Sequence, residues 1–114
     1  MTKQDEVVYF LQEFKAKMAI WPILFRDDRG KNMATLSVLE ITPLYREKVL
    51  SELETKDFSE GPLPELLHGG ADMWVFGKEI KKQEVYIKIS LGKSTNAICI
   101  SFHLAEHKMK YPFK

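Results

Sequence analysis

The spacing of apolar residues changes partway along this chain, and that change limits the folds open to it. In the stretch QEVYIKISLGKSTNAICISFH, residues 83 to 103, apolar and polar residues alternate on both sides of a short polar turn. A period of two is typical of strands with one buried face. The segment MWVFGKEI, residues 73 to 80, precedes it and has the composition of a strand. The sequence therefore predicts an antiparallel meander of three strands, at about 73–80, 85–91 and 97–103.

The first half of the chain follows the helical period instead. Residues 5–19 carry apolar side chains three or four positions apart, which predicts an amphipathic helix that ends before Trp21 and Pro22. The side chains of its apolar stripe are Val7, Phe10, Leu11, Phe14 and Met18. Core packing is also the expected role of the aromatic Tyr9. A short extended piece is expected to follow at residues 23–26.

Two shorter helices and a long connection are predicted next. The first helix covers about 34–39, with Asn32 in a position to cap it. The second has Thr42 as its N-cap and Pro43 at its first position, and it reaches residue 53 or 54. Its expected apolar face consists of Leu44, Val49, Leu50 and Leu53. Residues 57–72 contain two prolines and three glycines and are expected to form a connection without regular structure.

The order of these elements favours one fold class. Helices come first and strands last, which is typical of an α+β domain. We expect the N-terminal helices to pack on one face of a small antiparallel sheet and to leave the other face partly open. A chain of 114 residues is long enough for one core, so residues 1–114 are predicted to form a single domain.

Composition excludes some classes of protein. No apolar run approaches the ~20 residues of a membrane span, and the N-terminus lacks the pattern of a secretory signal. Cys99 is the single cysteine and cannot form an internal disulfide, so we expect a cytoplasmic protein. A formal charge of +1 argues against nucleic-acid binding through bulk charge, although the last third of the chain is basic.

The alternation also predicts a polar row on the face opposite the core. If Ile98, Ile100 and Phe102 face the core, the opposite face carries Tyr86, Lys88, Ser90, Ser101 and His103. A solvent-exposed sheet face would have the same composition. The functional alternative is that an aromatic ring, an ammonium and an imidazole converge on an anionic substrate.

Those three groups are sufficient for RNA cleavage without a metal. The ribose 2′-hydroxyl is the nucleophile, so the protein supplies only a base, an acid and cations for the phosphate. The predicted catalytic residues are Tyr86, Lys88 and His103. Candidates of second rank for substrate binding are Arg26, Lys78 and His107.

Other chemistries have weaker support in the sequence. The chain has no HExxH motif, no paired CxxC and no phosphate-binding glycine loop, and we expect no cofactor. A zinc site built from His68, His103, His107 and Cys99 remains a third and weaker hypothesis.

The sequence resembles the MqsR-type toxins of bacterial toxin–antitoxin pairs. The resemblance lies in the order of five elements over about residues 7–103: a TLxxL-like helix at 35–39, KDF at 56–58, a strand with Trp74, QEVYIKI at 83–89 and ICISFH at 98–103. It implies a RelE-like fold and a ribosome-independent endoribonuclease that acts on mRNA. It also implies a cognate antitoxin with a helix-turn-helix DNA-binding part.

The resemblance also assigns roles to individual residues. Tyr86 and Lys88 match the tyrosine and lysine of the family's VYLKI strand, and His103 stands where the family has a lysine thought to act in catalysis. The chain departs from the family at Glu60 or its neighbour Ser59, in place of a lysine, and at Val75, in place of a glutamine. The alternative function is a non-catalytic RNA- or protein-binding module of the same fold.

Overall fold

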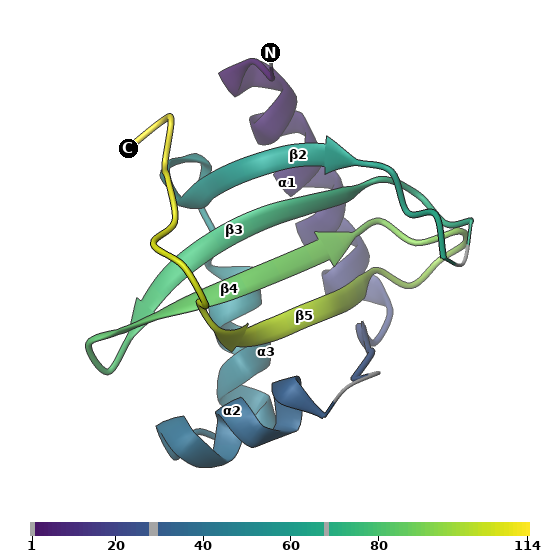
Figure 1. Ribbon diagram of the computed structural model, residues 1–114. Helices are drawn as coiled ribbons and strands as arrows, with labels where there is room; N and C mark the ends of the chain where they lie inside the picture. Colours follow the sequence, from purple (N-terminus) through teal and green to yellow (C-terminus); the bar gives the residue numbers. More distant parts are fainter. Residues whose placement is uncertain (1, 28–29, 68) are drawn as a thin grey trace.

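The described part of the chain is an α+β domain built on a five-stranded sheet (Figure 1). This computed structural model describes residues 2–27, 30–67 and 69–114. The helices are α1 (Gln4–Ile20), α2 (Lys31–Leu39) and α3 (Pro43–Ser51), with a 3-10 turn at Thr55–Asp57. The strands are β1 (Leu24–Phe25), β2 (Phe58–Leu63), β3 (Met73–Ile80), β4 (Gln83–Ser90) and β5 (Ile98–Leu104).

The strands lie in the order β1-β5-β4-β3-β2. Strands β2 to β5 pair antiparallel, as the predicted meander requires, whereas β1 pairs parallel with β5. The sheet is therefore mixed, and the prediction of an antiparallel sheet was wrong at this edge. The extended piece expected at residues 23–26 contains β1.

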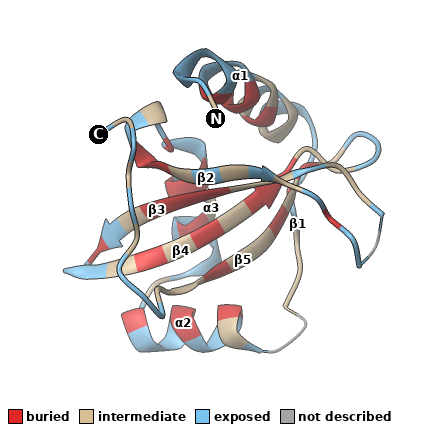
Figure 2. Ribbon diagram, turned by 45° about the horizontal axis from the view of Figure 1, so that its top comes forward, coloured by how far each residue is buried: buried red, intermediate tan, exposed pale blue. Residues whose placement is uncertain are grey.

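Helices α1 and α3 cover one face of the sheet, and α2 lies beside β5 (Figures 1 and 2). The core between them is formed by apolar side chains of α1 and of the central strands. Phe10 stacks on Trp74 with ring centroids 4.7 Å apart, and its ring centroid lies 6.1 Å from that of Phe76. Burial of such side chains supplies most of the driving force for folding. The α+β class expected from the sequence is confirmed.

Two side chains expected in the core lie outside it. Tyr9 and Leu44 are 65% and 75% exposed. On α3 the buried face includes Arg46 in place of Leu44, and its guanidinium carbon lies 3.6 Å from the centroid of the Phe25 ring. The aliphatic part of an arginine side chain can cover apolar surface. A pattern of apolar residues therefore does not reveal that an arginine occupies a buried position.

The predicted N-cap of α3 is confirmed, whereas that of α2 was wrong. The Thr42 hydroxyl accepts a hydrogen bond of 3.0 Å from the Tyr45 amide. In α2, which begins at Lys31, the carboxylate of Asp27 accepts from the amides of Asn32 and Met33 at 2.9 and 3.1 Å. The Asn32 side chain is buried and points to the sheet.

Strand β2 lies within the segment that we expected to be a connection. It pairs with β3 in an irregular register, in which Phe58, Glu60 and Leu63 oppose Phe76, Val75 and Met73. Gly61, with φ of 137°, sits within this irregularity, and a Cβ there would come within 3.1 Å of the Met73 carbonyl oxygen. Glycine and proline are tolerated here because β2 is an edge strand. The same two residue types made the segment look like a loop in the sequence.

Strand β5 contains a bulge that the alternation did not predict. Lys88 opposes Ser101, while the next residue, Ile89, opposes Cys99, so Ile100 is an extra residue in β5. Cys99 and Phe102 are consequently both buried against the helices. The prediction that Ile98 and Ile100 share the core face with Phe102 was wrong. Among the described helices, none has both the length and the apolar character needed to cross a membrane.

Candidate functional site on the open face of the sheet

The floor of the candidate site is formed by two neighbouring strands. Tyr86 and Lys88 of β4 lie directly opposite His103 and Ser101 of β5. Directly opposed residues of antiparallel strands project on the same face and lie within contact distance. Because Val85, Ile87 and Ile89 are fully buried against the helices, these four side chains lie on the face that the helices leave open.

The three predicted catalytic residues are grouped around the Tyr86 ring. The rings of Tyr86 and His103 are stacked, with centroids 5.2 Å apart and planes inclined by 13°. The Lys88 ammonium lies 5.7 Å from the centroid of the Tyr86 ring. The tyrosine ring is therefore flanked by an imidazole and a cation, as the predicted polar row required.

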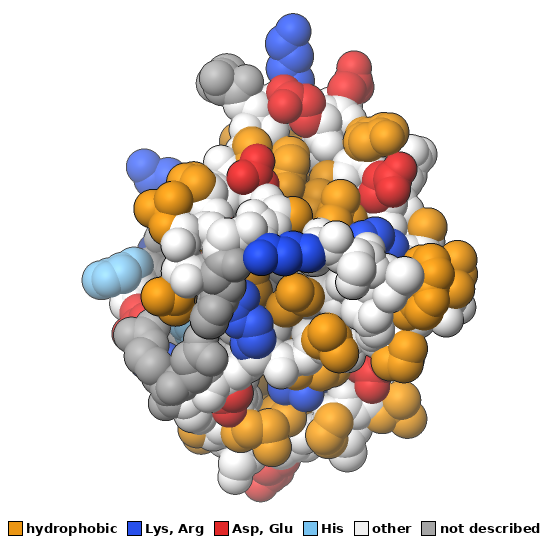
Figure 3. Space-filling view, turned by 90° about the vertical axis from the view of Figure 1, so that its right-hand side faces the viewer, with side chains coloured by type: hydrophobic (Ala, Val, Ile, Leu, Met, Phe, Trp, Pro, Cys, Tyr) orange, Lys and Arg blue, Asp and Glu red, His pale blue; other side chains and the backbone are white. Residues whose placement is uncertain are grey.

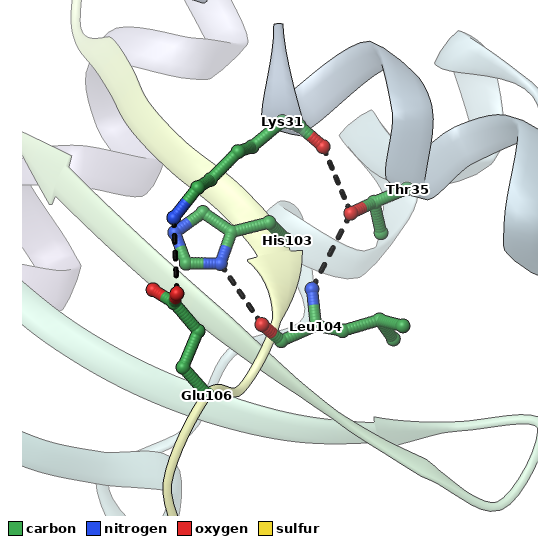
Figure 4. Close-up of polar contacts among 5 residues, drawn as sticks. All are labelled: Lys31, Thr35, His103, Leu104 and Glu106. Atoms are coloured by element: carbon green, nitrogen blue, oxygen red, sulfur yellow. Dashed lines mark hydrogen bonds and ion pairs between the residues drawn. The ribbon is translucent and has the colours of Figure 1, made fainter. Parts of the chain in front are cut away.

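Helix α2 positions His103 by binding the backbone amides of the residues before and after it. The amide of Phe102 donates to Asn32 Oδ1 at 2.8 Å. The amide of Leu104 donates to Thr35 Oγ1 at 3.3 Å, as Figure 4 shows. Asn32 and Thr35 are each 5% exposed and lie one helical turn apart. Sequence reasoning missed this pair, although two small polar residues three apart on a short helix are a detectable signal.

One nitrogen of His103 is already engaged. Nδ1 lies 3.0 Å from the carbonyl oxygen of Leu104 (Figure 4). A carbonyl oxygen can only accept, so this contact places a proton on Nδ1. In the neutral ring, Nε2 is then left as an acceptor, which is the arrangement that a general base needs.

Burial keeps the Tyr86 hydroxyl in its neutral form. Desolvation raises the pKa of Tyr86 above its usual value, and the nearby carboxylate of Glu60 raises it further. The hydroxyl therefore stays protonated through the physiological range and can donate a hydrogen bond. It is not a source of phenolate.

The C-terminal segment, residues 105–114, forms one wall of the site. It crosses the open face in front of β4 and β3 (Figure 1). Glu84 holds it, because its carboxylate accepts from the Met109 amide at 3.2 Å and from the Tyr111 hydroxyl at 2.7 Å. Gly77 allows the close approach, since a Cβ there would collide with the Tyr111 hydroxyl.

Two adjoining pockets open onto this floor. The first, of about 480 Å³, lies under the C-terminal segment and is lined by Ser59, Glu60, Tyr86, Lys88, Ser101, His103, Glu106, His107, Lys108, Met109 and Lys110. The second, of about 300 Å³, shares Lys88, Ser101 and His103 with it and extends towards Arg26 and Lys31. The Lys31 ammonium pairs with the Glu106 carboxylate at 3.1 Å, at the junction of the two (Figure 4).

The candidates of second rank divide between the two faces. His107 lines the first pocket and Arg26 the second. Lys78 lines neither, because it opposes the buried Val85, and its ammonium pairs with the Asp57 carboxylate at 3.2 Å. The structure therefore does not bring Lys78 to the site. Residues that the sequence did not single out, but which line these pockets, are Lys31, Lys108, Lys110 and Glu106.

The described residues give no metal site. Among them, no three histidine, cysteine, aspartate or glutamate side chains are grouped as a metal ion would require. His68, one of the ligands of the zinc hypothesis, lies outside the described residues.

Comparisons of the chain with models of known protein families, with characterised proteins and with solved structures gave no match. The resemblance to the MqsR-type toxins therefore rests on the order of the sequence elements alone.

Proposed function

We propose that this protein is a bacterial toxin that cleaves mRNA in the cytoplasm without a metal ion and has a RelE-like fold. The observation that carries the proposal is the cluster of Tyr86, Lys88 and His103 on the floor of a pocket on the open sheet face. The cluster combines a proton acceptor, a cation and a neutral hydroxyl donor. Cleavage through the ribose 2′-hydroxyl requires these groups and no protein nucleophile.

In the proposed reaction His103 Nε2 takes the proton of the 2′-hydroxyl. The 2′-oxygen then attacks the adjacent phosphorus, and the bond from phosphorus to the 5′-oxygen breaks. The products are a 2′,3′-cyclic phosphate and a 5′-hydroxyl, which receives its proton from an acid at the pocket. His107 is the imidazole candidate for this acid, because it lines the same pocket.

The other two residues stabilise the phosphate and orient the substrate. Lys88 places a cation beside the negative charge that develops on the phosphate oxygens. Tyr86 offers its hydroxyl to a phosphate oxygen and fixes the imidazole plane by stacking at a centroid distance of 5.2 Å. Positioned donors of this kind are most effective when they are held before the substrate binds.

The proposed partner is a cognate antitoxin with a helix-turn-helix part, which follows from the family resemblance. An antitoxin that neutralises the protein would prevent RNA from reaching the open face. Co-expression of the candidate antitoxin should restore growth that expression of this chain inhibits. A growth defect that persists although the two proteins bind each other would contradict this part of the proposal.

The proposal is tested by measuring cleavage of single-stranded RNA in the presence of EDTA. We expect His103→Ala to lower kcat about 10²- to 10⁴-fold, the range of general acid–base catalysis. Lys88→Ala should also lower the rate, whereas Lys78→Ala, which removes a strand lysine that does not line the site, is the matched control. Wild-type protein that cuts no RNA, free or on ribosomes, would refute the proposal.

A second candidate function is a non-catalytic binding module. The first pocket contains Glu60 and Glu106 beside its cations, and this mixture of charge also suits a protein partner. A binding module predicts that the His103→Ala variant loses affinity and effect in parallel. A catalytic site predicts loss of cleavage with RNA affinity retained.

A further inference from the structure

The candidate site continues into a third pocket at the far end of β5. The third pocket shares Arg26, Glu65 and Ile100 with the second, which in turn shares Lys88, Ser101 and His103 with the first. The three pockets therefore adjoin in a single path along the open side of β5. We refer to the third as the end pocket.

The end pocket is chemically different from the catalytic floor. It has a volume of about 430 Å³ and an apolar lining that includes Leu24, Ile98 and Ile100. Ile98 and Ile100 face this side because the bulge in β5 turns them away from the core. Leu24 is 51% exposed and offers apolar surface to this pocket.

Cations stand at the rim of the end pocket. Arg26 and Lys93 both line it. The Lys93 ammonium lies 3.9 Å from the point where a Cβ at Gly69 would be, so it reaches across to the neighbouring loop. Figure 3 shows this end of the molecule, where lysine and arginine side chains lie among hydrophobic ones.

Two carboxylates near the end pocket accept hydrogen bonds from backbone amides. Glu65 is 8% exposed and accepts from the Gly70 amide at 3.0 Å. Asp27 caps the first turn of α2. These amides hold both acids in place, and Lys93 is the lining cation that we assign to an anion at the rim.

The path is long enough for more than one nucleotide. Five residues of β5 separate Ile98 from His103, which corresponds to about 16 Å at the usual rise of a strand. Stacked nucleotides in one strand of a nucleic acid rise about 3.4 Å each. A strand whose scissile phosphate lies at His103 can therefore place a flanking base at the end pocket.

We propose that the end pocket binds a flanking nucleobase of a single-stranded RNA whose scissile phosphate lies beside Lys88 and His103. The base packs on Leu24, Ile98 and Ile100, and Lys93 contacts its phosphate. Proteins hold unpaired bases by packing aromatic or apolar side chains on the base, while cations follow the phosphate backbone. This inference rests on the proposed function, since it takes RNA as the ligand.

The test is an abasic scan of one single-stranded oligoribonucleotide, with cleavage and binding measured separately. Cleavage gives kcat/KM for each strand. Binding is measured by fluorescence anisotropy on the same strands carrying 2′-O-methyl groups, which cannot be cleaved through the 2′-oxygen. We expect one position that flanks the cut to show a loss of about 5- to 150-fold in both readouts when its base is removed.

The pocket is assigned by repeating the scan on two leucine variants. Leu24→Ala should reduce the penalty at that one position and leave the cleavage of a strand truncated before it unchanged. Leu44→Ala is the matched control, because Leu44 is an exposed leucine on α3 that lines a different groove. The control should retain the full wild-type penalty.

The outcomes distinguish a failure of the end pocket from a failure of the proposed RNA cleavage. Cleavage with no base-specific penalty, or a penalty that Leu24→Ala leaves unchanged, overturns the end pocket and retains the nuclease. Binding with the predicted penalty but no cleavage supports the end pocket and overturns the nuclease. Absence of both binding and cleavage, including a protein that binds only peptides, overturns both.

Discussion

Strands β4 and β5 carry the two halves of the candidate site and lie side by side, yet they are held in different ways. β4 is a central strand, and its buried residues Val85, Ile87 and Ile89 are fully covered by the helices. The outer edge of β5 pairs with only two residues of β1, and beyond them Asn32 and Thr35 of α2 take its amides. Burial thus positions Tyr86 and Lys88, whereas polar contacts from a helix add to the burial of Cys99 and Phe102 in positioning His103.

Removing buried volume from β4 should have the largest effect on stability. Ile87→Ala deletes methyl groups from a side chain that is 0% exposed, and we expect the free energy of unfolding to fall by about 2–5 kcal/mol. Urea denaturation measures this change. Val38→Ala, at a position 61% exposed on α2, is the control and should change stability little. A loss below 1 kcal/mol for Ile87→Ala would show that β4 does not depend on burial.

Removing the polar contact to β5 should have a smaller effect on stability and a local effect on the site. Asn32→Ala leaves the Phe102 amide and the Ile100 carbonyl without this partner, and the expected cost is about 1–3 kcal/mol. Amide hydrogen exchange should accelerate at Phe102 more than at Ile87. Ser37→Ala, an exposed position on the same helix, is the control. Equal acceleration in β4 and β5 would contradict the difference between the strands.

The buried thiol of β5 predicts a loss of stability in alkali. Burial raises the pKa of Cys99 to about 12, whereas an unfolded cysteine titrates near 9. Stability from this group is therefore complete below about pH 9 and is lost as pH rises towards 12, because the unfolded chain releases the proton first. The expected loss is about 1 kcal/mol between pH 7 and 10. Cys99→Ala should remove this part of the pH dependence, and an unchanged slope would be evidence against the buried thiol.

Loosening the C-terminal segment should have the smallest effect on stability. Glu84→Gln weakens the acceptor of the Met109 amide and the Tyr111 hydroxyl, with an expected cost of about 1 kcal/mol or less. The visible consequence is faster tryptic cleavage after Lys108 or Lys110, which line the first pocket. Glu79→Gln, an exposed position on β3, is the control. Unchanged proteolysis would mean that Glu84 does not hold this wall of the site.

The same difference between the strands explains what the sequence could predict. Alternation in β4 was sufficient to place Tyr86 and Lys88, because burial of one face is a local pattern that the pleat enforces. The carbonyl of the bulge residue Ile100 accepts a hydrogen bond from Asn32, which is 68 residues away in the chain. No pattern within β5 contains that information, so the faces of Ile98 and Ile100 were predicted wrongly.

Sequence patterns also predicted other features that depend on neighbouring residues, and they failed for strands at the edges of the sheet. The cap at Thr42 depends on its own turn and was predicted correctly. Strand β2 depends on pairing with β3, which lies ten or more residues away in the chain, and its Gly61 and Pro62 gave the opposite local signal. The stacking of His103 on Tyr86 agrees with the predicted row, because the register of the β4–β5 pair is regular at that position.

The central claim is that the Tyr86, Lys88 and His103 cluster cleaves RNA through the ribose 2′-hydroxyl. The most direct measurement compares an all-ribose oligonucleotide with one that carries a single 2′-deoxy substitution at the cut position, in EDTA. We predict that the ribose strand yields a 2′,3′-cyclic phosphate and a 5′-hydroxyl, and that the substituted strand is not cut there. Cleavage of the 2′-deoxy position at a comparable rate would contradict the claim.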